Sequence, residues 1–168
     1  MKGITLIGMP GVGKSTIGKL LAEKLNYKFI DLDVLIKEKT GKSHADIIKE
    51  RGERELIKFE GELACGLDLT ETVFAPGGSI IYFYPAMEKL EKETAIIYLS
   101  LPLSEIGKRL AGRLETRGIV GLTRWGIEGV FVSRSPLYQL FARHVVECQG
   151  LDEEKIADRI YALLQHQP

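Results

Sequence analysis

The sequence lacks several features that mark particular classes of protein. It has two cysteines, Cys65 and Cys148, without a Cys-x-x-Cys spacing, so we expect free thiols rather than a disulfide or a zinc site. The three histidines, His44, His144 and His166, are isolated and predict no metal site. Twenty-three basic residues balance 23 acidic ones, and no apolar stretch reaches the roughly 18 residues that a membrane span needs. With no signal-peptide pattern either, we expect a cytoplasmic protein that binds neither nucleic acid nor membrane.

The chain is long enough for a single domain, residues 1–168, and 45% of its residues are hydrophobic. Short apolar runs alternate with longer stretches of helical period, which is typical of a parallel sheet with helices on both faces. Candidate strands span residues 4–7, 28–30, 72–75, 95–99 and 144–147. Candidate helices span residues 14–25, 33–40, 43–67, 85–90, 103–112, 126–143 and 152–164. Residues 112–126, rich in glycine and arginine and without a sustained period, predict a mobile lid.

A phosphate-binding loop is predicted at GMPGVGKST, residues 8–16. Gly8, Gly13, Lys14 and Ser15 satisfy the pattern G-x-x-x-x-G-K-[ST], between an apolar strand and a helical pattern. In such a loop, backbone N–H groups and the positive end of the following helix hold phosphate oxygens. Lys14 would reach the β and γ phosphates, and Ser15 would supply an oxygen to Mg²⁺. Because the guanine-reading Asn-Lys-x-Asp element is absent, we expect ATP. The expected nucleotide-binding residues in this segment are Gly11, Val12, Gly13, Lys14, Ser15 and Thr16.

Two carboxylates, Asp31 and Asp33, follow the second predicted strand in the segment FIDLDVLIKEKTG. If the strand continues through both, they point the same way beside the phosphate loop. One can then hold water on Mg²⁺, while the other orients or deprotonates an acceptor hydroxyl. The alternative is that Asp33 only caps a helix beginning at Val34. Since the chain is short, with short connections, we expect a small kinase rather than a hydrolytic machine.

Six segments together resemble the shikimate kinases, in that family's order and approximate spacing: GMPGVGKST, FIDLDVLIKEKTG, GERELIKFEGELA, PGGS, TRGIV and RSPLYQLFARHVV. The resemblance covers nearly the whole chain. It implies a three-layer α/β P-loop fold of the nucleoside monophosphate kinase type, with a five-stranded parallel sheet. It also implies transfer of the γ-phosphate of ATP to the 3-hydroxyl of shikimate. We expect the protein to work as a monomer.

The resemblance also implies roles for individual residues. Asp31 would lie near magnesium, and Asp33 would bind shikimate hydroxyls. The guanidinium of Arg134 would hold the shikimate carboxylate through two parallel hydrogen bonds. Arg117 would reach the transferring phosphate or the adenine when the lid closes. Lys14, Asp33 and Arg117 are therefore the expected catalytic residues, and Arg117 joins the nucleotide-binding set. The substrate-binding residues would be Asp33, Gly77, Gly78, Ser79 and Arg134, with a substrate-binding helical region at about residues 32–67.

Three positions depart from the family pattern. Ile57 stands where the family has a substrate-binding arginine. Arg54 or Lys58 could replace that arginine, or both could be ordinary solvated charges. Ser79 stands at the third position of a glycine triplet, and Gly118 replaces a proline after the lid arginine, which suggests a looser lid. Two alternatives therefore stay open: a related kinase for another small hydroxylated metabolite, and a nucleotide-binding regulatory protein without kinase activity.

Overall fold

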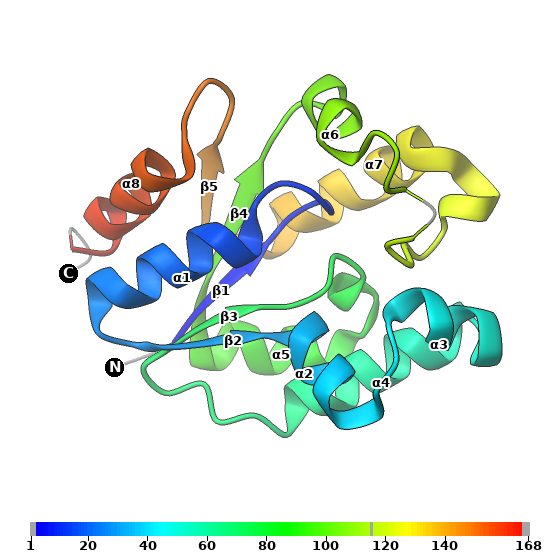
Figure 1. The fold of residues 1–168 in the computed structure, drawn as a ribbon. Helices are drawn as coiled ribbons and strands as arrows, with labels where there is room; N and C mark the ends of the chain where they lie inside the picture. Colours follow the sequence, from blue (N-terminus) through cyan, green and yellow to red (C-terminus); the bar gives the residue numbers. More distant parts are fainter. Residues whose placement is uncertain (1–2, 115, 166–168) are drawn as a thin grey trace.

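A computed structural model describes residues 3–114 and 116–165 of the chain. The outer ends of the predicted domain, Glu115 of the predicted lid, and His166 lie outside the described residues. Five parallel strands form one sheet in the order β2-β3-β1-β4-β5 (Figure 1). The strands are β1 (Gly3–Ile7), β2 (Lys28–Asp31), β3 (Thr72–Ala75), β4 (Thr94–Ser100) and β5 (His144–Glu147). The predicted five-stranded parallel sheet is confirmed.

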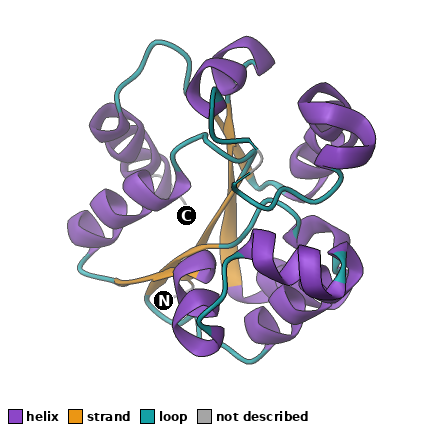
Figure 2. Ribbon diagram, turned by 45° about the vertical axis from the view of Figure 1, so that its right-hand side comes forward, coloured by secondary structure: helices purple, strands orange, loops and turns teal. Residues whose placement is uncertain are grey.

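Helices lie on both sides of this sheet, as Figure 2 shows with the sheet turned nearly edge-on. They are α1 (Lys14–Leu25), α2 (Leu32–Thr40), α3 (His44–Arg51), α4 (Glu53–Cys65), α5 (Tyr84–Glu93), α6 (Leu103–Leu110), α7 (Leu122–Phe141) and α8 (Glu153–Gln165), with a short 3₁₀ helix η1 (Ile80–Tyr82). Helix α1 packs against α8, and α4 packs against α5. Among the described residues, no helix has the length and apolar character to span a membrane.

The central strands are buried because helices cover both of their faces. Every residue of β1 is buried, and β4 is buried from Thr94 to Leu99. Such uninterrupted burial explains why these strands appear in the sequence as continuous apolar runs rather than alternating patterns. Cys65 is half-buried and Cys148 is buried, and neither forms a disulfide, so the prediction of free thiols is confirmed.

Two predicted helices differ from the structure by more than three residues at one boundary. The predicted helix 43–67 is divided at Gly52, whose φ of 89° and ψ of 166° end α3 and turn the chain into α4. Helix α7 begins at Leu122, within the predicted lid, and is kinked at Gly126, where φ is 63° and ψ is 178°. Both breaks occur at glycines because positive φ values are costly for residues with a Cβ.

Three loops lie together at the carboxyl end of the sheet, because β1, β2 and β3 are parallel. The chain leaves β1 for the phosphate loop, leaves β2 at Asp31 and leaves β3 at Ala75, and Asp31 is paired with Ala75 in the parallel register. Since β1 and β2 are separated by β3, the carboxyl ends of these strands border a single crevice. In open parallel sheets, ligands bind in this position.

Candidate functional site

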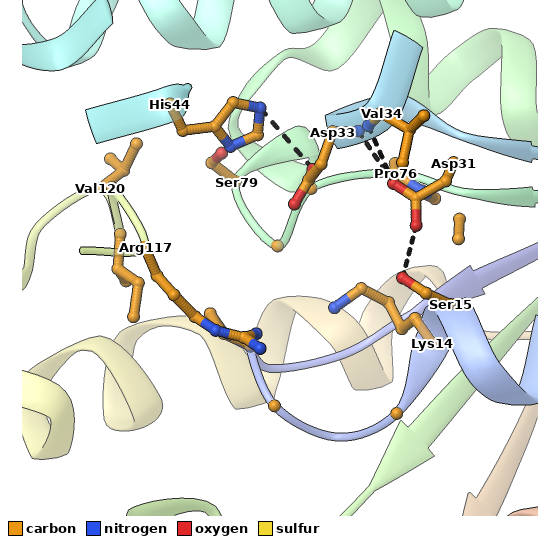
Figure 3. A pocket seen from close by; sticks show the side chains of 18 of the residues that line it. Lys14, Ser15, Asp31, Asp33, Val34, His44, Pro76, Ser79, Arg117 and Val120 are labelled. Atoms are coloured by element: carbon orange, nitrogen blue, oxygen red, sulfur yellow. Dashed lines mark hydrogen bonds and ion pairs between the residues drawn. The ribbon is translucent and has the colours of Figure 1, made fainter. Parts of the chain in front are cut away.

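A pocket of about 670 Å³ occupies this crevice. Its walls come from the phosphate loop, the ends of β2 and β3, the start of α3, the lid segment and α7. Figure 3 shows Lys14, Asp33 and Arg117 directed toward the same space from three different elements. Of the predicted site residues, all except Val12 line this pocket. The side chain of Val12 is buried in the core, and its N–H donates to the carbonyl of Met9 over 3.3 Å.

The phosphate loop delivers an open helix end to the pocket. Gly13 is the N-cap of α1 with a φ of 108°, and no side chain caps the first turn of the helix. The positive end of α1 therefore faces the pocket. Lys14 Nζ donates to the carbonyls of Gly8 at 2.9 Å and Met9 at 3.2 Å. Desolvation lowers the pKa of Lys14 to about 8, although the carboxylates of Asp33 and Asp31 act in the opposite direction.

Asp31 and Asp33 meet at the pocket in a different way from the one predicted. Strand β2 ends at Asp31, so the strand does not continue through both aspartates, and the condition from which their common direction was inferred is not met. The alternative that Asp33 caps the next helix is wrong, because the N-cap of α2 is Asp31. Its Oδ1 accepts the N–H groups of Asp33 at 3.0 Å and Val34 at 3.3 Å, while its Oδ2 contacts the hydroxyl of Ser15. Asp33 lies in the first turn of α2, with a side chain that is 61% exposed.

The glycine pair after β3 allows two charged side chains to pack against the turn. A Cβ on Gly77 would collide with Oε1 of Glu60, and one on Gly78 would lie 2.6 Å from Nη1 of Arg134. The pair therefore makes room for protein side chains, in addition to bordering the pocket. Ser79 has a φ of −85°, which any residue can adopt, and its Oγ donates to Oε2 of Glu60 at 2.6 Å.

Arg134 is almost completely buried, with 1% of its surface exposed. Its Nη2 donates to the carbonyl of Val120 in the lid segment at 2.9 Å, and its guanidinium lies 5.6 Å from the centre of the Tyr82 ring. Tyr138, one turn further along α7, donates its hydroxyl to the carbonyl of Gly78 at 2.7 Å. The guanidinium is thus held at the pocket wall between α7, the lid segment and the turn after β3.

The lid segment is held against α3 and α4. Gly118 has a φ of 61°, and a Cβ there would collide with the backbone of Ala45 and lie 2.8 Å from the Cβ of His44. The N–H of Gly121 donates to Oε1 of Glu53 at 2.7 Å. A proline could not adopt this φ, so the glycine permits a close contact. Gly118 therefore packs closely against the start of α3, while the looser lid that this glycine suggests stays a prediction.

Sequence reasoning missed several residues of the pocket, among them Arg109, His44 and Glu60. Arg109, in the last turn of α6, donates to the carbonyl of Val12 at 3.2 Å, and a basic residue just before the lid was the available signal. Nε2 of His44, a residue isolated in the sequence, lies 3.6 Å from Oδ1 of Asp33 and 3.6 Å from Oε1 of Glu60. Burial raises the pKa of Glu60. No local pattern connects His44 with Glu60.

The structure also separates the proposed replacements for the missing arginine from this pocket. Ile57 is half-buried against the core, and Lys58 pairs with Glu62 at 3.9 Å beside a second cavity. Arg54 is exposed, and of these three residues, all within the described chain, none lines the main pocket. The structure therefore favours the interpretation of Arg54 and Lys58 as solvated charges.

Comparisons with known proteins agree with this architecture. The shikimate kinase family model matches residues 10–165. A shikimate kinase of Persephonella marina is 36% identical over 141 residues, which cover 82% of this chain and 84% of the relative. One from Chlorobium chlorochromatii is 37% identical over 164 residues, covering 94% and 84%. The solved structure of Acinetobacter baumannii shikimate kinase in complex with shikimate is 28% identical, with a TM-score of 0.88 over 98% of this chain and 93% of that one. The chain belongs to the shikimate kinase family.

Proposed function

We propose that this protein is an ATP-dependent kinase that transfers the γ-phosphate to the 3-hydroxyl of shikimate, giving shikimate 3-phosphate and ADP. The observation that carries the proposal is the placement of Lys14 and Asp33 at one pocket, together with Arg117 and Arg134. Membership of the shikimate kinase family supports the same reaction. Phosphoryl transfer needs mainly positioning and charge stabilisation, and this pocket offers groups for both.

The nucleotide would bind with its phosphates on the loop between β1 and α1. Backbone N–H groups of the loop and the uncapped start of α1 would hold the phosphate oxygens. Lys14 Nζ now donates to two loop carbonyls, and it would exchange these for the β and γ phosphates. Arg109 and Arg117 border the same space and would contribute further positive charge. We infer that residues 112–126 act as a lid that carries Arg117 toward the transferring phosphate.

Ser15 and Asp31 fit a magnesium site. Their side-chain oxygens touch beside the phosphate loop, and Mg²⁺ prefers oxygen ligands of this kind. We infer that these two residues hold the ion, directly or through water. When bound, Mg²⁺ would neutralise the charge that develops on the phosphate oxygens. The two backbone N–H groups that Asp31 accepts would keep its carboxylate oriented toward Ser15.

The acceptor would bind at the other end of the pocket. Asp33, exposed and on the first turn of α2, would accept the hydrogen bond of the attacking hydroxyl and orient or deprotonate it. Arg134 would hold the acceptor carboxylate, for which its Nη2 must leave the carbonyl of Val120. Movement of the lid segment would therefore accompany acceptor binding.

A coupled assay of ADP release tests the proposal. With ATP and magnesium, we expect turnover with shikimate well above the background of ATP hydrolysis by water. The second candidate, a kinase for another small hydroxylated acid, is favoured by Ser79 and His44 in the pocket lining and by Ile57 in place of the family's arginine. Turnover of such an acid without turnover of shikimate would support it. ATP binding without transfer to any acceptor in the panel would instead indicate a regulatory protein.

We further propose a cytoplasmic monomer that binds neither nucleic acid nor membrane. The balanced charge of the chain supports this, because no excess of one sign would attract a polyanion or a lipid surface. One chain also supplies all the walls of the pocket described above.

A further inference from the structure

Three metal-ligating side chains converge at the acceptor end of the pocket. Asp33, His44 and Glu60 come from α2, α3 and α4, and their donor atoms all lie within 4.8 Å of one another. Nε2 of His44 is 3.6 Å from Oδ1 of Asp33 and 3.6 Å from Oε1 of Glu60. Figure 3 shows the imidazole of His44 turned toward Asp33 across the top of the pocket.

Two of these donor atoms are buried and lack a hydrogen-bond partner. Within the described chain, neither Nε2 of His44 nor Oε1 of Glu60 has one, and the Glu60 side chain is completely buried. Buried polar atoms are almost always satisfied, because an unpaired one carries a desolvation cost. The other carboxylate oxygen of Glu60 is already fixed by the hydroxyl of Ser79. The two atoms lie 3.6 Å apart, too far for a hydrogen bond between them, so a ligand placed between them would satisfy both.

We propose that Asp33, His44 and Glu60 form a binding site for a transition-metal dication of the Zn²⁺ type, separate from the magnesium site at Ser15 and Asp31. A tetrahedral zinc ion with ligands at about 2.0–2.1 Å separates its donors by roughly 3.3 Å, close to the spacing of His44 from both carboxylates. Imidazole favours zinc or cobalt over magnesium, which selects oxygen ligands. The fourth position would be open to the pocket.

The surroundings support a dication but also limit its affinity. Two carboxylates compensate the charge of the ion, and the hydrogen bond from Ser79 fixes the orientation of Glu60. Arg134 and Lys14 oppose it, since both carry positive charge toward the same pocket. Asp33 is the only exposed ligand of the three and can adjust its position to complete the coordination.

Occupancy of this site would interfere with the acceptor. This step rests on the proposed function, in which Asp33 receives the acceptor hydroxyl. A metal ion on Asp33 occupies the oxygen that the hydroxyl needs, whereas the phosphate loop stays free. Zinc would therefore inhibit transfer competitively with the acceptor and not with ATP. Binding of the metal itself requires no catalytic activity, so the two parts of the proposal can be tested separately.

The binding test uses tag-free, full-length protein titrated with Co²⁺, followed by visible absorption, and with Zn²⁺, followed by calorimetry. We expect one site with absorption bands of tetrahedral cobalt and no thiolate charge-transfer band, because no cysteine is among the ligands. His44→Ala and Glu60→Gln should each weaken binding by at least about 100-fold, because loss of a residue that merely orients a metal ligand already costs up to about 100-fold. His144→Ala, on β5 and outside the pocket lining, is the matched control and should leave binding unchanged.

Several outcomes would overturn the proposal: no saturable binding by the wild-type protein, binding undiminished in both variants, or a thiolate band that reports Cys65. Loss of binding in Asp31→Asn with retention in Glu60→Gln would place the ion at the magnesium site instead. Circular dichroism checks that each variant is folded. If His44→Ala is unfolded, metal binding by the conservative variant Glu60→Gln tests the site. If Co²⁺ binds as expected while shikimate gives no turnover, the metal site stands and the proposed acceptor fails.

Discussion

The hydrogen bond between Ser79 and Glu60 offers a quantitative test of how the acceptor end of the pocket is built. The Ser79 hydroxyl donates to Oε2 of Glu60 at 2.6 Å, and both residues are buried. Replacing Ser79 by alanine keeps the backbone, since φ is −85° and no strain arises. The change leaves Glu60 with both carboxylate oxygens buried and without a hydrogen-bond donor among the described side chains.

The expected loss of stability depends on whether the Glu60 carboxylate, which accepts the hydrogen bond of Ser79, is charged. A hydrogen bond to a charged group contributes about 1.5–3 kcal/mol, and a bond between neutral groups about 0.5–1.5 kcal/mol. If Glu60 is ionised at pH 7, Ser79→Ala should lower the free energy of unfolding by about 2 kcal/mol at this pH. For a domain of this size, this corresponds to a fall in melting temperature of about 4–8 °C.

The stability lost in Ser79→Ala should depend on pH, and the ionisation of Glu60 decides whether the loss grows or shrinks as pH rises. Burial raises the pKa of Glu60 above its usual 4.5, so between that value and the higher folded one the native state binds more protons than the unfolded state. Stability from this group is then lost as pH rises through the folded pKa. Ser79 favours the ionised form, so Ser79→Ala should cost more at pH 7 than at pH 4.5.

Urea unfolding of wild type, Ser79→Ala, Glu60→Gln and the double variant gives the coupling energy between the two side chains at each pH. We expect a coupling of about 1–3 kcal/mol at pH 7 and less at pH 4.5. A loss below about 0.5 kcal/mol in Ser79→Ala at pH 7, or equal losses at both pH values, would refute the reasoning. Such a result would mean that water replaces the lost donor or that Glu60 is neutral in the native protein.

Four further substitutions address the catalytic proposals. Lys14→Ala should lower the rate of transfer by about 10²–10³-fold in single-turnover measurements, because it removes a cation from the transferring phosphate, and a rate within threefold of wild type would contradict this role. Asp33→Asn should reduce kcat by about 10²–10⁴-fold while calorimetry shows nearly unchanged ATP affinity; loss of ATP binding would mean that this carboxylate serves the nucleotide. Arg134→Ala should raise KM for the acceptor more than tenfold and leave KM for ATP close to wild type, whereas equal losses for both would argue against a carboxylate anchor. Gly118→Pro should displace the lid from α3, because proline cannot adopt a φ of 61°, and limited proteolysis should then cleave the lid faster than in the wild-type protein.

The nucleotide end of the site was predictable because one short segment builds it. Residues 8–16 are contiguous, and their pattern between an apolar run and a helical period predicts a strand, a loop and a helix, which are present as β1, the phosphate loop and α1. The sheet was equally accessible, since strands buried on both faces leave continuous apolar runs. Asp31 and Asp33 were correctly predicted to lie beside the phosphate loop, but they reach it from a helix N-cap and a first helical turn rather than from one continuous strand. Which of the two capped the helix depended on where β2 ended, and a difference of one or two residues in that boundary exchanges their roles.

The helix boundary at Gly52 could not be read from periodicity. Helices α3 and α4 both bury apolar side chains, Ile47 in one and Leu56 and Ala64 in the other, so the helical pattern continues across the break. The break has a consequence for the site, because it allows α4 to turn Glu60 into the pocket while α3 begins with His44 at the same place. A single straight helix from 43 to 67 would separate these residues by 16 positions, or about 24 Å.

The acceptor end was therefore hidden from the sequence for a physical reason. It is assembled from α2, α3, α4, the turn after β3, the lid segment and α7, and each of these four helices contributes only one or two side chains. A family resemblance predicts the helices and strands. The chemistry of the pocket between them depends on a few side chains, which can differ between proteins of the same fold. Ile57 packs against the core and does not line the pocket, whereas His44 and Ser79 both lie next to Glu60 in the pocket. Tests of acceptor selectivity should therefore begin with His44, which lines the pocket, rather than with Arg54 or Lys58, which do not.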